Sequence, residues 1–83
     1  MPDKKVILYT KDFCPYCKHA KRLFDSKGVT YEEVDLENDP EGFKALMQKT
    51  GMRTVPQIFI GETLVGGFSE LSELNEKGEL DGM

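Results

Sequence analysis

The sequence predicts an α/β fold whose elements follow the order β-α-β-α-β-β-α. Three observations support it: two strand-forming runs are each followed by an amphipathic helical pattern, a glycine-containing pair separates two further strands, and a helical pattern closes the chain. Strands that alternate with helices are typical of α/β folds. No repeat, linker or low-complexity segment interrupts the 83 residues, so we expect a single domain over residues 1–83.

The first β-α unit covers the N-terminal third of the chain. Val6–Tyr9 is apolar without alternation, which is typical of a strand covered on both faces, so this strand should be central in the sheet. A helical pattern begins at Pro15, and Gly28 is placed to end it. The apolar face of this predicted helix is formed by Ala20, Leu23 and Phe24.

The second β-α unit follows directly. Thr30–Leu36 predicts a strand that is less apolar than the first and therefore lies nearer the sheet edge. Because a helix connects these two strands, they should be parallel. Asp39 predicts the N-cap of a second helix, Pro40 its first residue and Gly51 its end.

The rest of the chain predicts a hairpin and a third helix. Gln57–Ile60 and Thr63–Val65 flank the two-residue connection Gly61-Glu62, which indicates an antiparallel hairpin with glycine at the first turn position. Ser69 can cap a last helix that ends near Gly78.

Composition and charge exclude several classes of protein. Hydrophobic residues make up 39% and charged residues 31% of the chain, a globular balance. The longest apolar run, Val6–Tyr9, is too short to cross a bilayer, and the N-terminus lacks the apolar core of a secretory signal. We therefore expect a cytoplasmic protein with no membrane partner. The net charge of −4 argues against a nucleic-acid partner, which would need a basic footprint.

The charge is unevenly distributed along the chain. Residues 1–28 carry seven Lys or Arg and three Asp, a net +4, whereas residues 29–83 carry four basic and twelve acidic residues, a net −8. Charged residues on solvated faces account for such an asymmetry as well as a functional site does. It matters because both cysteines lie in the basic part.

Cys14 and Cys17 are the candidate reactive groups. Two cysteines with two residues between them can meet only if the chain turns, and the predicted helix start provides that turn with Cys14 as N-cap and Pro15 as the first helical residue. The unpaired N–H groups at a helix start stabilise a thiolate at Cys14, and Lys11 and Lys18 add positive charge. Because the thiolate attacks in thiol–disulfide exchange, we predict redox chemistry, with Cys17 the more buried sulfur.

A zinc half-site and an inert structural disulfide are the alternative interpretations of this pair. Zinc needs four ligands, and beside one CxxC the sequence offers a single histidine, His19, and carboxylates, so no second half-site of the usual spacing exists. A disulfide across two intervening residues closes too small a loop to constrain the unfolded chain much. CxxC near a βαβ pattern favours redox chemistry and no bound metal. We interpret His19 as a solvated helix residue without a role.

Four short motifs stand in order along the chain: Tyr9-Thr10-Lys11, Phe13-Cys14-Pro15-Tyr16-Cys17, Thr54-Val55-Pro56-Gln57-Ile58-Phe59-Ile60 and Gly66-Gly67-Phe68-Ser69. Together they resemble the dithiol glutaredoxins, and the resemblance covers nearly the whole chain. It implies the thioredoxin fold, a four-stranded mixed sheet flanked by three helices, which agrees with the predicted order. It also implies glutathione as the reducing co-substrate and no permanently bound cofactor.

The resemblance assigns roles to individual residues. It implies that Cys14 is the nucleophile that forms a mixed disulfide and that Cys17 is the resolving cysteine. Pro56 matches a proline that the family holds in the cis form, which would leave the backbone of Val55 to pair with the tripeptide. The implied glutathione-binding residues are Lys11, Tyr16, Thr54, Val55, Pro56, Gly67, Phe68 and Ser69.

Glutathione carries carboxylates at both of its ends. The N–H groups of Phe68 and Ser69, which open the last helix, suit the γ-glutamyl carboxylate. The neighbouring Gly66 and Gly67 permit a close approach of backbone to ligand.

The chain departs from the family pattern at three positions. Glu70 stands where many relatives have an aspartate, which would lengthen a contact to the γ-glutamyl amine. Phe43 stands where many members carry Gln or Arg, so that either Lys44 or Arg53 holds the glycine carboxylate or that carboxylate is held more weakly. Phe68 replaces an extra cysteine that some relatives have.

These observations predict a monomeric, glutathione-dependent thiol–disulfide oxidoreductase that reduces protein disulfides and protein–glutathione mixed disulfides. Two other hypotheses stay open. A reductase fed by thioredoxin reductase is compatible with Phe43 and Glu70. In an iron–sulfur scaffold, Cys14 and glutathione would hold a cluster between two copies, although Pro15 and Cys17 count against it.

Overall fold

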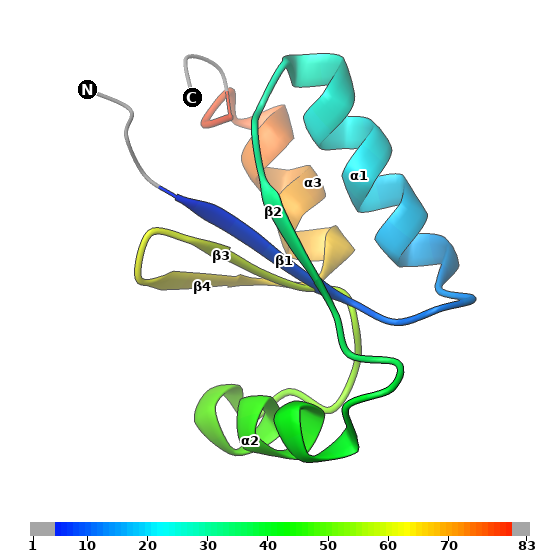
Figure 1. Cartoon of the computed structure of the whole chain (residues 1–83). Coiled ribbons are helices and arrows are strands. Elements are labelled where there is room, and N and C mark those ends of the chain that lie inside the picture. The colour runs from blue at the N-terminus through cyan, green and yellow to red at the C-terminus, as the bar shows by residue number, and fades with distance from the viewer. Residues whose placement is uncertain (1–4, 81–83) are drawn as a thin grey trace.

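The computed structural model describes residues 5–80 and has seven elements of secondary structure (Figure 1). The predicted order β-α-β-α-β-β-α is confirmed. The elements are β1 (Val6–Thr10), α1 (Pro15–Lys27), β2 (Glu32–Asp35), α2 (Pro40–Thr50), β3 (Gln57–Ile60), β4 (Thr63–Gly66) and α3 (Phe68–Glu76).

The four strands form one mixed sheet in the order β2-β1-β3-β4. The central strand β1 is parallel to β2 and antiparallel to β3, and β4 is antiparallel to β3. These pairings confirm the predicted central and edge strands. The strand β2 is shorter than the predicted 30–36, because β1 offers it partners only from Ile7 to Thr10.

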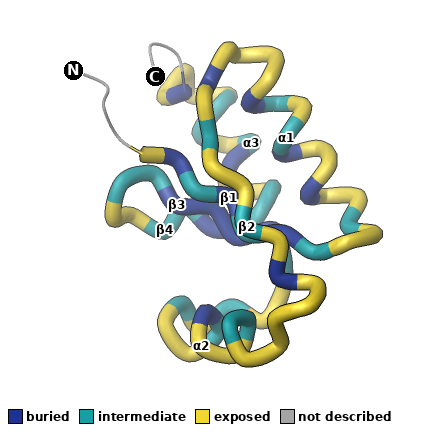
Figure 2. Tube along the Cα trace, in the orientation of Figure 1, coloured by how far each residue is buried: buried dark blue, intermediate teal, exposed yellow. Residues whose placement is uncertain are grey.

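Helices cover both faces of the sheet (Figure 1), which agrees with the fold that the resemblance implies. Figure 1 shows α1 and α3 together on one face and α2 on the other. In Figure 2 the buried positions gather on the central strands and on the inward side of α1. The larger apolar cluster lies on the α1 and α3 face, around Val6, Leu8, Ala20, Phe24, Val29, Ile58, Leu71 and Leu80. A smaller cluster contains Leu36, Leu46 and Phe59.

The first two helices begin and end where the sequence predicts. Cys14 is the N-cap of α1, and its C-cap Gly28 adopts the left-handed conformation at φ 69°. The Asp39 carboxylate accepts the N–H of Gly42 at 3.0 Å and caps α2, which ends at Gly51.

The predicted cap of the third helix is wrong. The N-cap is Gly67, two residues before the expected Ser69, and α3 begins at Phe68. The physical reason is the Glu70 carboxylate, which accepts the Gly67 N–H at 2.8 Å and fixes the earlier start. The helix ends at Glu76, close to the predicted Gly78.

Within residues 5–80, no helix is both long enough and apolar enough to cross a membrane.

The buried ring of Phe24 provides a test of the core. Phe24 is 0% exposed within the larger cluster, so Phe24→Ala should lower the free energy of unfolding by about 3–5 kcal/mol. Phe13→Ala removes the same atoms from a ring that is 97% exposed, and it should change that free energy by no more than about 0.5 kcal/mol. Urea unfolding of both variants measures the two effects, and equal losses would contradict this assignment of the core.

Candidate redox site

Cys14 and Cys17 form a disulfide at the start of α1, with their Cα atoms 5.2 Å apart. As the N-cap residue, Cys14 accepts the Cys17 N–H on its sulfur at 3.1 Å. Cys17 is 2% exposed, whereas Cys14 is half-buried, so the predicted difference in burial is confirmed. The sulfur that an outside thiol can reach is therefore that of Cys14.

The segment before β3 brings a second stretch of backbone to this sulfur. The Val55–Pro56 peptide bond is cis, as the resemblance implies. The carbonyl oxygen of Val55 lies 3.7 Å from the Cys14 sulfur. Val55 precedes β3 and takes no part in its pairing with β1, which begins at Gln57. A backbone segment outside the sheet thus lies directly against the reactive sulfur.

The Gln57 side chain holds the segment before β3 in place through hydrogen bonds, a role that sequence reasoning missed. Its side chain is 0% exposed, and its amide nitrogen donates to the carbonyl oxygens of Met52 at 3.1 Å and Thr54 at 3.0 Å. The available signal was a polar residue at the first position of a buried strand, directly after Pro56.

A groove of about 460 Å³ runs beside the disulfide, between the start of α1, the segment before β3 and the start of α3. It brings together seven of the eight residues predicted to bind glutathione. It adds Met52, which sequence reasoning missed, and Glu70, which sequence reasoning gave only as a longer contact to the γ-glutamyl amine. The lining residues are Tyr16, Met52, Thr54, Val55, Pro56, Gly67, Phe68, Ser69 and Glu70.

The eighth predicted residue, Lys11, does not line this groove. Its ammonium group lies 4.0 Å from the centroid of the Phe43 ring, a cation–π contact to α2. Lys44 and Arg53, the suggested substitutes, line a different hollow, beside Gly51. Phe43 therefore orders a cation near the site instead of offering a hydrogen bond of its own.

The start of α3 presents backbone donors to the groove. Hydrogen bonding along this helix begins at Leu71, whose N–H donates to the Gly67 carbonyl at 3.1 Å. The N–H groups of Phe68 and Ser69 therefore have no partner within the helix. Gly66 adopts φ 122°, a backbone conformation that residues with a side chain rarely adopt, so a substitution at this turn would be strained.

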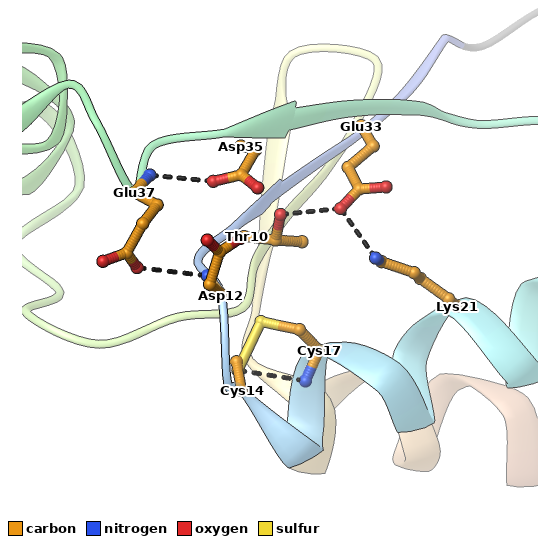
Figure 3. Close-up of polar contacts among 8 residues, drawn as sticks. All are labelled: Thr10, Asp12, Cys14, Cys17, Lys21, Glu33, Asp35 and Glu37. Atoms are coloured by element: carbon orange, nitrogen blue, oxygen red, sulfur yellow. Dashed lines mark hydrogen bonds and ion pairs between the residues drawn. A yellow bond between two sulfur atoms is a disulfide. The ribbon is translucent and has the colours of Figure 1, made fainter.

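Carboxylates from β2 and the residues after it lie on another side of the cysteine pair (Figure 3). The Glu37 carboxylate accepts the Asp12 N–H at 3.2 Å, and Asp35 accepts the Glu37 N–H at 2.8 Å. A hydrogen bond between the Asp12 and Asp35 carboxyl groups raises the pKa of Asp12, and desolvation and the nearby negative charges add to this effect. The surroundings of Cys14 are therefore less positive than the charge of residues 1–28 predicts.

Glu33 joins β2 to α1 in the same region. The Glu33 carboxylate accepts a hydrogen bond from the hydroxyl of the buried Thr10 at 2.8 Å. It also forms an ion pair with Lys21 at 2.7 Å. The hydrogen bond with Glu33 is the main cause of the raised pKa of Lys21. The charge of Lys21 is thus engaged by Glu33 and not by a cysteine.

Comparison with known proteins identifies relatives of this chain. A family model described as Glutaredoxin matches residues 6–65. A glutaredoxin from Neisseria meningitidis is 51% identical over 79 residues, which cover 94% of this chain and 93% of that protein. Glutaredoxin 3 from Escherichia coli is 41% identical over 76 residues, 92% of each chain.

The solved structures that resemble this chain are also glutaredoxins. The crystal structure of a buckwheat glutaredoxin–glutathione complex superposes with a TM-score of 0.85 at 35% identity, covering 95% of this chain and 74% of that one. The solution structure of a Brucella melitensis glutaredoxin has a TM-score of 0.81 at 42% identity, with 92% and 83% covered.

The Asp12–Asp35 pair predicts a dependence of stability on pH. Because the pKa of Asp12 is raised on folding, the stabilisation from its protonated form is present at low pH and is lost as the pH rises through that pKa. Asp12→Asn cannot ionise, so its Tm should exceed that of the wild type at pH 7, and the difference should shrink on acidification.

Thermal unfolding between pH 3 and pH 8 measures this difference. Glu62→Gln, at an exposed carboxylate in the turn between β3 and β4, is the matched control and should show no comparable change with pH. If Asp12→Asn were no more stable than the wild type at neutral pH, the two carboxyl groups would not repel each other in solution.

Proposed function

The chain belongs to the glutaredoxin family and is therefore a thiol–disulfide oxidoreductase. We propose that glutathione supplies the electrons for this reaction through Cys14 and Cys17. The observation that carries the proposal is the groove, which gathers predicted glutathione-binding residues from three separate elements beside the accessible sulfur. A tripeptide with a thiol could lie there with its sulfur directed to Cys14.

In the first route the substrate is a protein–glutathione mixed disulfide. The Cys14 thiolate attacks the glutathione sulfur, the mixed disulfide breaks, and the protein leaves as its thiolate. The thiolate of a second glutathione then attacks the glutathione sulfur bound to Cys14. This step releases glutathione disulfide and returns Cys14 as a thiolate, so Cys17 is not needed.

In the second route the substrate is a protein disulfide. Cys14 forms a mixed disulfide with one substrate sulfur and releases the other as a thiolate. Cys17 then attacks Cys14, which frees the second substrate thiol and leaves the Cys14–Cys17 disulfide. Two glutathiones reduce this disulfide and leave as glutathione disulfide. The N–H of Cys17 and the positive end of α1 stabilise the Cys14 thiolate in both routes.

Glutathione would be held by backbone groups and by charge. We assign the backbone of Val55 to the tripeptide main chain and the N–H groups of Phe68 and Ser69 to the γ-glutamyl carboxylate. Glu70 lines the same end of the groove, where its carboxylate suits the γ-glutamyl ammonium group. Lys11, ordered over the Phe43 ring, is the cation available for the glycine carboxylate.

The setting of the reaction is part of the same proposal. We expect residues 1–83 to act as one domain and as a monomer in the cytoplasm, on glutathionylated and disulfide-containing proteins. The comparison with the buckwheat complex supports glutathione as the ligand, since that relative matches 95% of this chain.

Serine variants separate the two routes. Cys14→Ser should abolish the reduction of both substrate classes, because no thiolate remains to attack. Cys17→Ser should retain turnover of a small glutathione mixed disulfide and lose most activity on a protein disulfide. A coupled assay with glutathione and glutathione reductase measures both. Loss of the small-substrate activity in Cys17→Ser would refute the division of roles, and turnover that needed thioredoxin reductase in place of glutathione would refute the electron source.

A further inference from the structure

Three aromatic rings meet where α1 and α3 begin. The Tyr16 ring is stacked on that of Phe68, with centroids 6.2 Å apart and an interplanar angle of 28°. The imidazole of His19 lies 6.0 Å from the Tyr16 ring and 5.6 Å from the Phe68 ring, measured between centroids. The three residues form a continuous aromatic cluster that bridges the two helices.

Two members of this cluster are walls of the groove, and His19 is not. Tyr16 and Phe68 line the groove, from α1 and α3 respectively. His19 is exposed one helical turn after Tyr16 and contacts both rings from outside the groove. In the described part of the chain, the imidazole of His19 makes these ring contacts and neither a hydrogen bond nor an ion pair.

Tyr16 needs such support because it is 62% exposed. A ring with so little burial can rotate away from the groove, and ordering it when a ligand binds would reduce affinity. Contacts between aromatic rings restrict that rotation before binding. His19 contacts both of the other rings, so it restricts Tyr16 and Phe68 together.

We propose that His19 is a positioning residue for glutathione, which sets the Tyr16 and Phe68 walls of the groove through ring contacts. The inference rests on the proposed function, since it concerns the ligand of the same groove. His19 acts through the two rings and touches neither the reacting sulfurs nor the ligand. Removing it should therefore weaken binding and leave the chemical step unchanged.

The test is a set of substitutions that separates the ring from the charge. The probe is S-methylglutathione, which has no thiol to exchange, and calorimetry on the reduced protein gives its Kd. We expect His19→Ala to raise the Kd by about three- to tenfold, the range that loss of aromatic contacts predicts. His19→Phe keeps a ring and should restore the Kd to within about twofold. His19→Lys supplies charge without a ring and should behave like His19→Ala.

Arg22→Ala is the matched control, because Arg22 is an exposed residue of α1 three positions further along. It should leave the Kd at the wild-type value. In the coupled assay with a small glutathione mixed disulfide, His19→Ala should raise KM by the same factor as the Kd and leave kcat unchanged. Thermal unfolding shows whether each variant is folded, which the exposure of His19 leads us to expect.

Two results would overturn the inference. In one, His19→Ala binds the probe as tightly as the wild type. In the other, His19→Lys restores binding and His19→Phe does not, so that charge and not the ring carries the effect. The proposed function fails in a different way: the wild type itself would then neither bind S-methylglutathione nor turn over with glutathione.

Discussion

The start of α1 is the constraint on which the rest of the site depends. Pro15 has no N–H to donate and fits the first helical position, so Cys14 becomes the N-cap residue and its sulfur takes the N–H of Cys17 at 3.1 Å. The helical geometry then turns Cys17 toward the core, where it is 2% exposed. The local geometry at the start of one helix thereby makes one sulfur accessible and the other buried, the difference on which the proposed division of roles rests.

The groove exists because three chain segments that are distant in sequence meet at one end of the sheet. The central position of β1 directs Cys14 to that end, and β3, paired with β1, starts there with Gln57. Gln57 pins the preceding segment through the carbonyl groups of Met52 and Thr54. The start of α3 completes the wall. The residues that line the groove are therefore placed by strand pairing and by one buried amide, and not by neighbours in the sequence.

The periodicity of the sequence was enough to predict the fold, because helix caps and turns are local. Pro40 and Gly51 bound α2 as expected, and the resemblance indicated the residues of the groove. What the sequence could not supply was side-chain geometry across elements. The Glu70 carboxylate moved the start of α3 to Phe68, and nothing in the local pattern shows that Lys11 meets the ring of Phe43. The ring contacts of His19 were missed for the same reason, since Phe68 is 49 residues away.

The electrostatics of the site are likewise decided by pairing in space. Parallel pairing with β1 carries Glu33 and Asp35 from the acidic part of the chain to the basic part. There Glu33 forms an ion pair with Lys21, and Asp35 raises the pKa of Asp12. An ion pair such as Lys21–Glu33 contributes little to a distant field, and the carboxyl groups of Asp12 and Asp35 offset positive charge instead of adding to it. The local stabilisation that the structure offers to negative charge on the Cys14 sulfur is therefore the start of α1, where the Cys17 N–H already bonds to that sulfur. The net charge of the surrounding sequence is a poor guide to the reactivity of Cys14.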